Sequence, residues 1–303
     1  MIKDSFGRPI TSIRISITQK CNLCCIYCHR EGEESSYTEM TPEEIQRIVG
    51  IAASFNIRSV KLTGGEPLLR SDILEIVKRI TDTPKLSEVS MTTNGTLLKG
   101  FAKPLKEVGL TRVNVSLDTL DLKTYRFITR SNELEMVVAG IKESVKAGLS
   151  PVKVNMVLLK GVNDDQVWNM INFARENSLI LQLIELESAS EDQFYQKYHF
   201  DLFQIEKELE GKAEKTIVRS MHHRKKYFLP GDVEVEVVKP MHNKEFCQYC
   251  TRIRVTSDGK LKPCLFRSNN LVDILSSIRN RASEEDVKEL FMKAVKRRIP
   301  YFT

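Results

Sequence analysis

The sequence lacks any apolar run long enough to cross a membrane, and its first ten residues, MIKDSFGRPI, are too polar for a secretion signal. It also has no low-complexity linker and no internal repeat beyond a strand-helix unit. These absences argue against a membrane-spanning protein and a repeat protein. We therefore expect a cytoplasmic protein with no membrane partner.

The charge is only moderately unbalanced. A formal net charge of +6 over 303 residues suits an anionic small ligand about as well as nucleic acid, which usually requires a denser basic face. A hydrophobic content of 41% can bury a substantial core, which fits one large α/β domain or one and a half domains. Charge and composition therefore do not decide between a small anionic ligand and nucleic acid.

The cysteines fall into two groups near opposite ends of the chain. In a chain with no export signal this grouping favours metal ligation over disulfides, because the cytosol keeps thiols reduced. The first group is Cys21, Cys24, Cys25 and Cys28, and the second is Cys247, Cys250 and Cys264.

Strand patterns alternate with helical patterns between the two groups. Such alternation builds a parallel sheet with helices outside it, as a partial barrel or an open doubly wound sheet. The predicted strands are 12–18, 58–63, 86–93, 111–118, 151–159 and 179–187, and the predicted helices are 41–55, 71–80, 98–108, 133–147 and 164–177.

The unusual residues follow the carboxyl ends of these strands, where ligands of parallel sheets bind. They are the first cysteine group, TGGEP (63–67), TTNG (92–95) and SLD (116–118). We expect them to share one rim of the sheet.

The pattern changes after residue 188. A loop with a helix leads to a hairpin that turns at Pro230-Gly231-Asp232, and a second hairpin turns at Asp258-Gly259 before a final helix over 283–298. We predict a partial barrel over residues 1–230 and a small module over 231–303 that carries the second cysteine group.

The first cysteine group can be divided in two ways. Two abutting Cys-x-x-Cys pairs could hold zinc, although pairs with no loop between them would wrap one ion with difficulty. Alternatively Cys21, Cys25 and Cys28 have the spacing C-x3-C-x2-C, and three thiolates on a cubane cluster leave one iron open for chemistry. In this division Cys24 is a buried or spare thiol.

The second group has the spacing C-x2-C-x13-C, with Arg252 and Arg254 between its members. Residues two apart on a strand point to the same face, so both guanidinium groups would project together and could bind phosphate oxygens. The alternative is a zinc site completed by His242 or water.

The C-x3-C-x2-C spacing resembles that of the radical S-adenosylmethionine (SAM) superfamily. The resemblance also includes Tyr27, just before the last cysteine, and the GGEP segment at 64–67. It implies a partial TIM-like barrel of six βα units and a 4Fe–4S cluster on the three cysteines, whose open iron binds SAM. Tyr27, Gly65 and Ser116 would then contact this cofactor, which yields a 5′-deoxyadenosyl radical on reduction.

The whole chain resembles the GTP 3′,8-cyclase family of molybdenum cofactor (molybdopterin) biosynthesis. The resemblance is carried by FGRPITSIRISITQKCNLCCIYC, KVNMVLLKGVND and, most specifically, FCQYCTRIRVTSDGKLKPCLF. It implies a second 4Fe–4S cluster on Cys247, Cys250 and Cys264 that binds the guanine base. The residues implied to bind GTP are Arg14, Lys61, Thr92, Lys153, Arg252 and Arg254.

In that family the radical removes the C3′ hydrogen of GTP, and the carbon radical attacks C8. The resemblance therefore implies a lyase that forms (8S)-3′,8-cyclo-7,8-dihydroguanosine 5′-triphosphate. It also implies an electron donor such as a ferredoxin or flavodoxin, a downstream pterin synthase, a homodimer, and no nucleic-acid partner.

The chain departs from this family at several positions. Lys61 and Gln182 stand where relatives often carry arginine, and Glu187 replaces a methionine. The chain ends in RRIPYFT rather than Gly-Gly. We expect other groups, Arg297 or Arg298 among them, to replace that tail.

Two other functions stay open at this point. One is a peptide-modifying radical SAM enzyme, which also carries auxiliary clusters after its barrel. The other is an electron carrier or zinc-binding module, which the long barrel-like middle of the chain disfavours.

Overall fold

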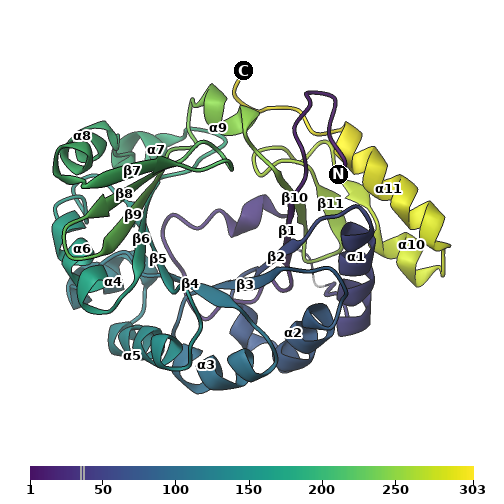
Figure 1. The fold of residues 1–303 in the computed structure, drawn as a ribbon, viewed down its shortest axis with the longest axis horizontal. Helices are drawn as coiled ribbons and strands as arrows, with labels where there is room; N and C mark the ends of the chain where they lie inside the picture. Colours follow the sequence, from purple (N-terminus) through teal and green to yellow (C-terminus); the bar gives the residue numbers. More distant parts are fainter. Residues whose placement is uncertain (35, 37) are drawn as a thin grey trace.

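The chain folds around one twelve-stranded sheet in the computed structural model, which describes residues 1–34, 36 and 38–303. The strand order is β12-β11-β10-β1-β2-β3-β4-β5-β6-β9-β8-β7. Strands β10, β1 to β6 and β9 run parallel, and the strands beyond them at either end are antiparallel. Figure 1 shows the sheet curving around a central space.

The strands have the following bounds. They are β1 (Ser12–Ser16), β2 (Ser59–Thr63), β3 (Glu88–Thr93), β4 (Arg112–Ser116), β5 (Lys153–Leu158), β6 (Ile180–Glu185), β7 (Lys215–Val218), β8 (Lys225–Leu229), β9 (Val233–Val238), β10 (Arg252–Val255), β11 (Lys260–Lys262) and β12 (Val272–Asp273).

Helices lie on the outer side of the curved sheet (Figure 1). In the part of the chain that the structure describes, no helix is long and apolar enough to cross a membrane. The helices are α1 (Pro42–Ser54), α2 (Ile73–Thr81), α3 (Leu98–Glu107), α4 (Leu122–Thr129), α5 (Leu134–Lys146), α6 (Val167–Glu176), α7 (Gln193–Tyr198), α8 (Phe203–Lys212), α9 (Lys244–Gln248), α10 (Leu275–Arg279) and α11 (Glu284–Lys296), with short 3-10 turns η1 (Arg30–Gly32) and η2 (Pro67–Leu69).

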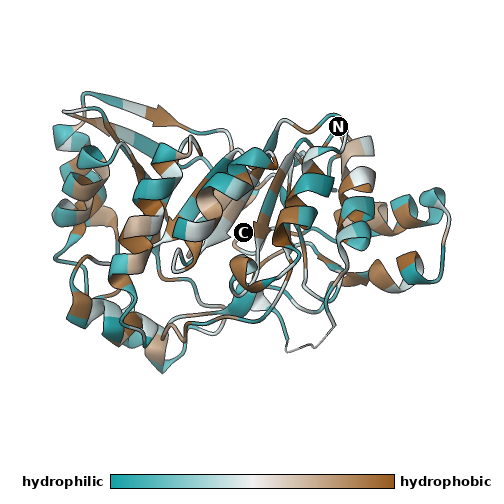
Figure 2. Ribbon diagram, turned by 90° about the horizontal axis from the view of Figure 1, so that it is seen from below, coloured by the Kyte–Doolittle hydropathy of each residue, from teal (hydrophilic) through white to brown (hydrophobic). Residues whose placement is uncertain are grey.

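Alternation along the strands separates the apolar core from a polar interior. Ile13 and Ile15 of β1 belong to the hydrophobic core, together with Ile48 and Val49 of α1. Arg14 lies between the two isoleucines and faces the other way, because successive strand residues point to opposite faces. Figure 2 shows that the helices carry both hydrophobic and hydrophilic residues, and that hydrophobic residues also lie on the strands.

The parallel register then aligns inward-facing side chains from neighbouring strands. Arg14 pairs in register with Arg254 of β10 on one side and with Lys61 of β2 on the other. Gln182 of β6 pairs in the same way with Glu236 of β9. The strands therefore build continuous rows of polar groups inside the barrel.

The predicted fold, a partial TIM-like barrel of six βα units, is confirmed. All six predicted strands, the five predicted helices, both hairpins and the final helix are present. The sequence did not indicate α4 or β7, and the expected single helix after residue 188 is two helices, α7 and α8.

The proposed division at residue 230 stays a prediction. Residues 231–303 add β9 to one side of the six-stranded core and β10 to the other. The C-terminal part therefore extends the same sheet in both directions.

A buried ion pair joins the two ends of the chain. The Asp4 carboxylate accepts hydrogen bonds from Arg8 Nε at 2.8 Å and from Arg298 Nη1 at 2.9 Å. The Arg298 side chain is 1% exposed, so removing its carboxylate partner would leave a charge in a low-dielectric region.

We expect Asp4→Ala to lower the free energy of unfolding by about 3–5 kcal/mol, because it leaves two buried guanidinium groups without their carboxylate. Denaturant titration measures this change. Asp82→Ala, which breaks an exposed pair with Lys78, is the control and should change stability little. Equal effects of the two substitutions would contradict a structural role for Asp4.

Candidate active site

The first cysteine group lies in the loop that follows β1. Cys21 and Cys28 are exposed and Cys25 is half-buried. The loop is fixed by backbone hydrogen bonds, from Cys24 N to Thr129 O at 3.1 Å and from Cys28 N to Cys25 O at 3.1 Å. Cys24 is exposed, so the expectation of a buried thiol is wrong and its spare role stays a prediction.

The GGEP segment packs directly against this loop. A Cβ atom on Gly65 would lie 2.2 Å from the carbonyl oxygen of Lys20, so only glycine fits there. Gly65 N donates to Thr18 O at 2.7 Å, and Glu66 N donates to Lys20 O at 2.8 Å. The segment therefore positions the cysteine loop.

Tyr27 and Ser116 lie on the same side of the barrel as the first cysteines. The Tyr27 hydroxyl donates to Asp118 Oδ2 at 2.7 Å, and Val157 N donates to Asp118 Oδ1 at 2.8 Å. Burial raises the pKa of Asp118 to about 6, although these two hydrogen bonds act to lower it. Ser116 ends β4 two residues before Asp118 and is half-buried.

The second cysteine group lines the central cavity, to which Cys247, Cys250 and Cys264 all contribute. Arg8 Nη1 donates to the carbonyl oxygen of Cys247 at 2.8 Å, and Arg298 Nη2 donates to that of Cys250 at 2.7 Å. Burial opposes the Cys250 thiolate, but the nearby arginines outweigh it and lower the pKa of this thiol.

Each group offers three thiols, which is the donor set that a 4Fe–4S cubane with one open iron would take. His242, the possible zinc ligand, is instead 3.1 Å from Glu191 and mostly exposed.

The predicted substrate residues line one cavity with the second cysteine group. Nine lysine and arginine side chains but only three glutamates line it, so the cavity is strongly cationic. Its predicted members are Arg14, Lys61, Thr92, Lys153, Arg252 and Arg254. The first cysteine group, Tyr27, Gly65 and Ser116 are outside the lining, although His29 belongs to it.

Glu31 occupies the space between two of these arginines. Its carboxylate accepts a hydrogen bond from Arg14 Nη2 and one from Arg254 Nη1, the latter at 3.1 Å. Burial opposes the charge, but the two guanidinium groups lower the pKa of Glu31 to about 2. Glu31 therefore offsets one of the two positive charges in this part of the cavity.

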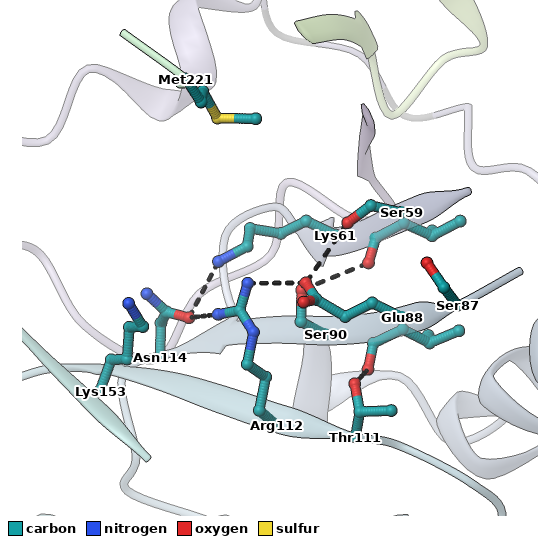
Figure 3. A network of polar contacts seen from close by, with 12 residues as sticks. Ser59, Lys61, Ser87, Glu88, Ser90, Thr111, Arg112, Asn114, Lys153 and Met221 are labelled. Carbon is teal, nitrogen blue, oxygen red and sulfur yellow. Dashed lines mark hydrogen bonds and ion pairs between the residues drawn. The ribbon is translucent and has the colours of Figure 1, made fainter. Parts of the chain in front are cut away.

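A second network runs along β2, β3 and β4 (Figure 3). Lys61 Nζ and Arg112 Nη1 each donate to Asn114 Oδ1 at 2.9 Å, and Arg112 Nη2 donates to Glu88 Oε1 at 2.6 Å. Burial, aided by Arg112 and Arg14, lowers the pKa of Lys61 well below its usual value. Lys61 has only a neutral amide as its hydrogen-bond partner among the described residues.

Glu236 holds the third network. Lys153 Nζ lies 2.5 Å from Glu236 Oε1, and Gln182 Nε2 donates to Oε2 at 2.6 Å. Burial lowers the pKa of Lys153 to about 8, with smaller effects from Arg219 and Arg112, although Glu236 acts in the opposite direction.

Several cavity residues were not predicted from the sequence. They are Arg8, Glu31, Glu88, Arg112, Arg219 and Arg224. The position of Arg112 at the start of a strand, two residues from Asn114 on the same face, was a usable signal. The turn that carries Arg219 and Arg224 follows β7, which the sequence did not indicate. No register or facing direction for these two arginines could therefore be predicted from the sequence.

The C-terminal residues reach the cavity, but not through the arginines. Ile299 and Tyr301 line it, whereas Arg297 and Arg298 do not. Arg297 Nη1 instead donates to Leu271 O at 2.8 Å.

Comparison with known proteins agrees with this geometry. Residues 15–174 match the model of the radical SAM superfamily, and residues 179–303 match that of Molybdenum Cofactor Synthesis C. A probable GTP 3′,8-cyclase of Thermococcus kodakarensis is 54% identical over 309 residues and 100% of both chains. Another from Methanothermobacter marburgensis is 49% identical over 304 residues and 99% of both chains.

Solved structures show the same fold at low identity. Streptococcus suis SuiB has a TM-score of 0.65 at 17% identity, over 97% of this chain and 67% of that one. The structure of anSMEcpe with bound AdoMet has a TM-score of 0.65 at 18% identity, over 94% of this chain and 79% of that one.

The chain is thus a radical SAM protein, a class whose cofactors are a 4Fe–4S cluster and SAM. Within this class it belongs to the GTP 3′,8-cyclase family.

Gly65→Ala should lower the iron bound after anaerobic reconstitution, because its new methyl group would displace the cysteine loop. Iron and sulfide analysis measures this. Gly100→Ala is the matched control, since a Cβ there meets nothing within 4 Å, and it should retain full iron content. Normal iron content in Gly65→Ala would contradict the positioning role.

Proposed function

We propose that the chain converts GTP to (8S)-3′,8-cyclo-7,8-dihydroguanosine 5′-triphosphate, the first step of molybdopterin biosynthesis. The observation that carries this proposal is the single cavity that combines the second cysteine group with nine lysine and arginine residues. GTP carries about four negative charges, which such a cavity can offset.

The first site would hold a 4Fe–4S cluster on Cys21, Cys25 and Cys28, with SAM beside Tyr27, Gly65 and Ser116. When bound, this pair supplies a 5′-deoxyadenosyl radical upon one-electron reduction. The GGEP segment supports the assignment because it fixes the loop through backbone hydrogen bonds rather than through the thiols.

The second site would hold another 4Fe–4S cluster on Cys247, Cys250 and Cys264. Its position on the cavity wall supports a role in binding the guanine base. Arg14, Lys61, Thr92, Lys153, Arg252 and Arg254 would bind the ribose triphosphate, and their arrangement around one cavity supports this assignment.

The remaining partners are proposed from the resemblance to the GTP 3′,8-cyclase family. A ferredoxin or flavodoxin would donate the electron, a pterin synthase would take the product, and two chains would form a homodimer. We place the chain in the cytoplasm, because that compartment keeps the cysteines of both groups reduced and available to a cluster. The 54% identity to a probable GTP 3′,8-cyclase over the full length of both chains disfavours a peptide-modifying radical SAM enzyme.

With GTP, SAM and a reductant under anaerobic conditions, Arg252→Ala should abolish nucleotide conversion while slow SAM cleavage continues. The reason is that Arg252 lines the substrate cavity and lies on β10, away from the first cysteine loop. Chromatography of the nucleotide and deoxyadenosine products measures both reactions.

Two cysteine variants serve as controls for this assay. Cys21→Ala should abolish both reactions, whereas Cys24→Ala should retain both, since Cys24 is outside the proposed ligand set. Deoxyadenosine formation by the wild type that is indifferent to GTP, with no new nucleotide, would overturn the proposed substrate.

GTP affinity should fall as the pH rises from about 7 to 9. Lys153 has a pKa of about 8 in the folded protein, so its positive charge is present below this pH and is lost above it. Equilibrium binding of GTP across this range measures the effect. Lys153→Arg should remove most of the decline, because a guanidinium stays protonated throughout. An identical decline in that variant would show that another group titrates.

A further inference from the structure

The carboxylate of Glu236 has more cationic neighbours than it can neutralise. Besides Lys153, Arg219 Nη1 lies 3.0 Å from Glu236 Oε2 and Arg224 Nη2 lies 3.6 Å from the same oxygen. Glu236 itself is fully buried, and all three cations line the cavity. One negative charge therefore faces three positive charges.

Several other cations near the cavity have more carboxylate for each positive charge. Arg14 and Arg254 share Glu31, and Arg112 pairs with Glu88. Lys226, a more distant neighbour of Glu236, has its own partner in Glu234 at 2.6 Å. Lys61 and Arg252 also line the cavity, and among the described residues neither has a carboxylate partner. The cluster of Lys153, Arg219 and Arg224 differs from them in that its three cations surround one buried carboxylate.

The turn between β7 and β8 holds the two arginines in place. Arg219 N donates to Arg224 O at 2.9 Å, which closes the turn. At its tip, His222 N donates to Tyr249 O at 2.9 Å and the His223 ring stacks on Tyr249. Met221 faces Lys61 across the cavity that both line (Figure 3). The turn thus bridges from the sheet edge to the second cysteine group.

Arg224 retains hydrogen-bonding capacity inside the protein. Among the described residues its buried Nε has no hydrogen-bond partner. Burial, reinforced by Arg219 and Arg112, lowers the pKa of Arg224 to about 10. The attraction of Glu236 acts in the opposite direction but does not outweigh the cost of burying the positive charge of Arg224. Residues arranged only for stability would not concentrate charge in this way, whereas an anionic ligand would relieve it.

We propose that Arg219 and Arg224 form a second phosphate-binding element, in which the β7–β8 turn binds the triphosphate of the nucleotide together with Lys153. This assignment rests on the proposed function and extends its substrate contacts to a turn outside the predicted motifs. Guanidinium groups suit this task because they form paired hydrogen bonds with phosphate oxygens. Gln182 is committed to Glu236 and Asn114 and supplies no charge on this wall.

The test compares the binding of GTP, GMP and guanosine to the reconstituted holoenzyme by equilibrium dialysis. Arg224→Ala should weaken GTP binding roughly 10- to 100-fold, since a charge-assisted hydrogen bond is lost. Guanosine binding should change by less than about twofold, because it presents no phosphate to the guanidinium. Arg219→Ala should show the same selectivity, and Arg224→Lys should lie between wild type and Arg224→Ala.

Lys225→Ala is the matched control, since Lys225 is in the adjacent position but pairs with exposed Glu210. It should bind all three ligands like the wild type. The thermal midpoint without nucleotide provides a second measurement: Arg224→Ala should keep or raise it, while losing the increase that GTP causes. A merely structural arginine would instead lower the midpoint without nucleotide.

The outcomes separate this assignment from the proposed function. If the wild type binds and converts GTP but Arg224→Ala binds it equally well, or loses guanosine and GTP equally, the turn is not a phosphate-binding element. If the wild type binds GTP no more tightly than guanosine and does not convert it, both proposals are overturned.

Discussion

Positive charge enclosed by the barrel is the constraint on which the arrangement of the interior depends. Nine lysines and arginines line one cavity, and like charges in a region of low dielectric repel strongly. The protein offsets part of this repulsion with a few buried carboxylates, each placed between cations. Glu31 and Glu236 both serve more than one partner, so the interior is ordered but remains short of negative charge.

The apolar face of the same sheet supports this charged interior. Every strand except β7 places apolar residues in the core between sheet and helices, and the parallel register keeps the inward residues level with one another. Burial of the aliphatic side chains stabilises the strands, at roughly 25 cal/mol per Å² of apolar surface removed from water. The repulsion among cations can therefore persist without unfolding, and an anionic substrate would relieve it.

The sequence was informative wherever the signal was local. Alternation over residues 12–18 predicted β1, in which Arg14 faces away from its apolar neighbours. The choice of Cys21, Cys25 and Cys28 over Cys24 as cluster ligands stays a prediction. Pairings across long distances left no local trace. Nothing near Glu236 indicates that it would lie beside Lys153, 83 residues earlier. The turn with Arg219 and Arg224 was missed for a related reason. The strand before it, β7, is short and has no buried residue, so it lacks the alternation of buried and exposed residues that predicts a strand.

The incomplete closure of the barrel explains why the cationic cavity and the second cysteine group coincide. In the described part of the chain, β7 and β12 end the sheet without pairing to each other. The side left open is covered by segments from three regions, namely Arg8, the turn at 219–224 and the C-terminal residues Ile299 and Tyr301. These segments converge on Cys247 and Cys250, whose carbonyl oxygens are held by Arg8 and Arg298. A barrel closed by eight strands would need no such cover, whereas this one gains a wall on which, in the proposed function, a second cluster and the nucleotide would meet.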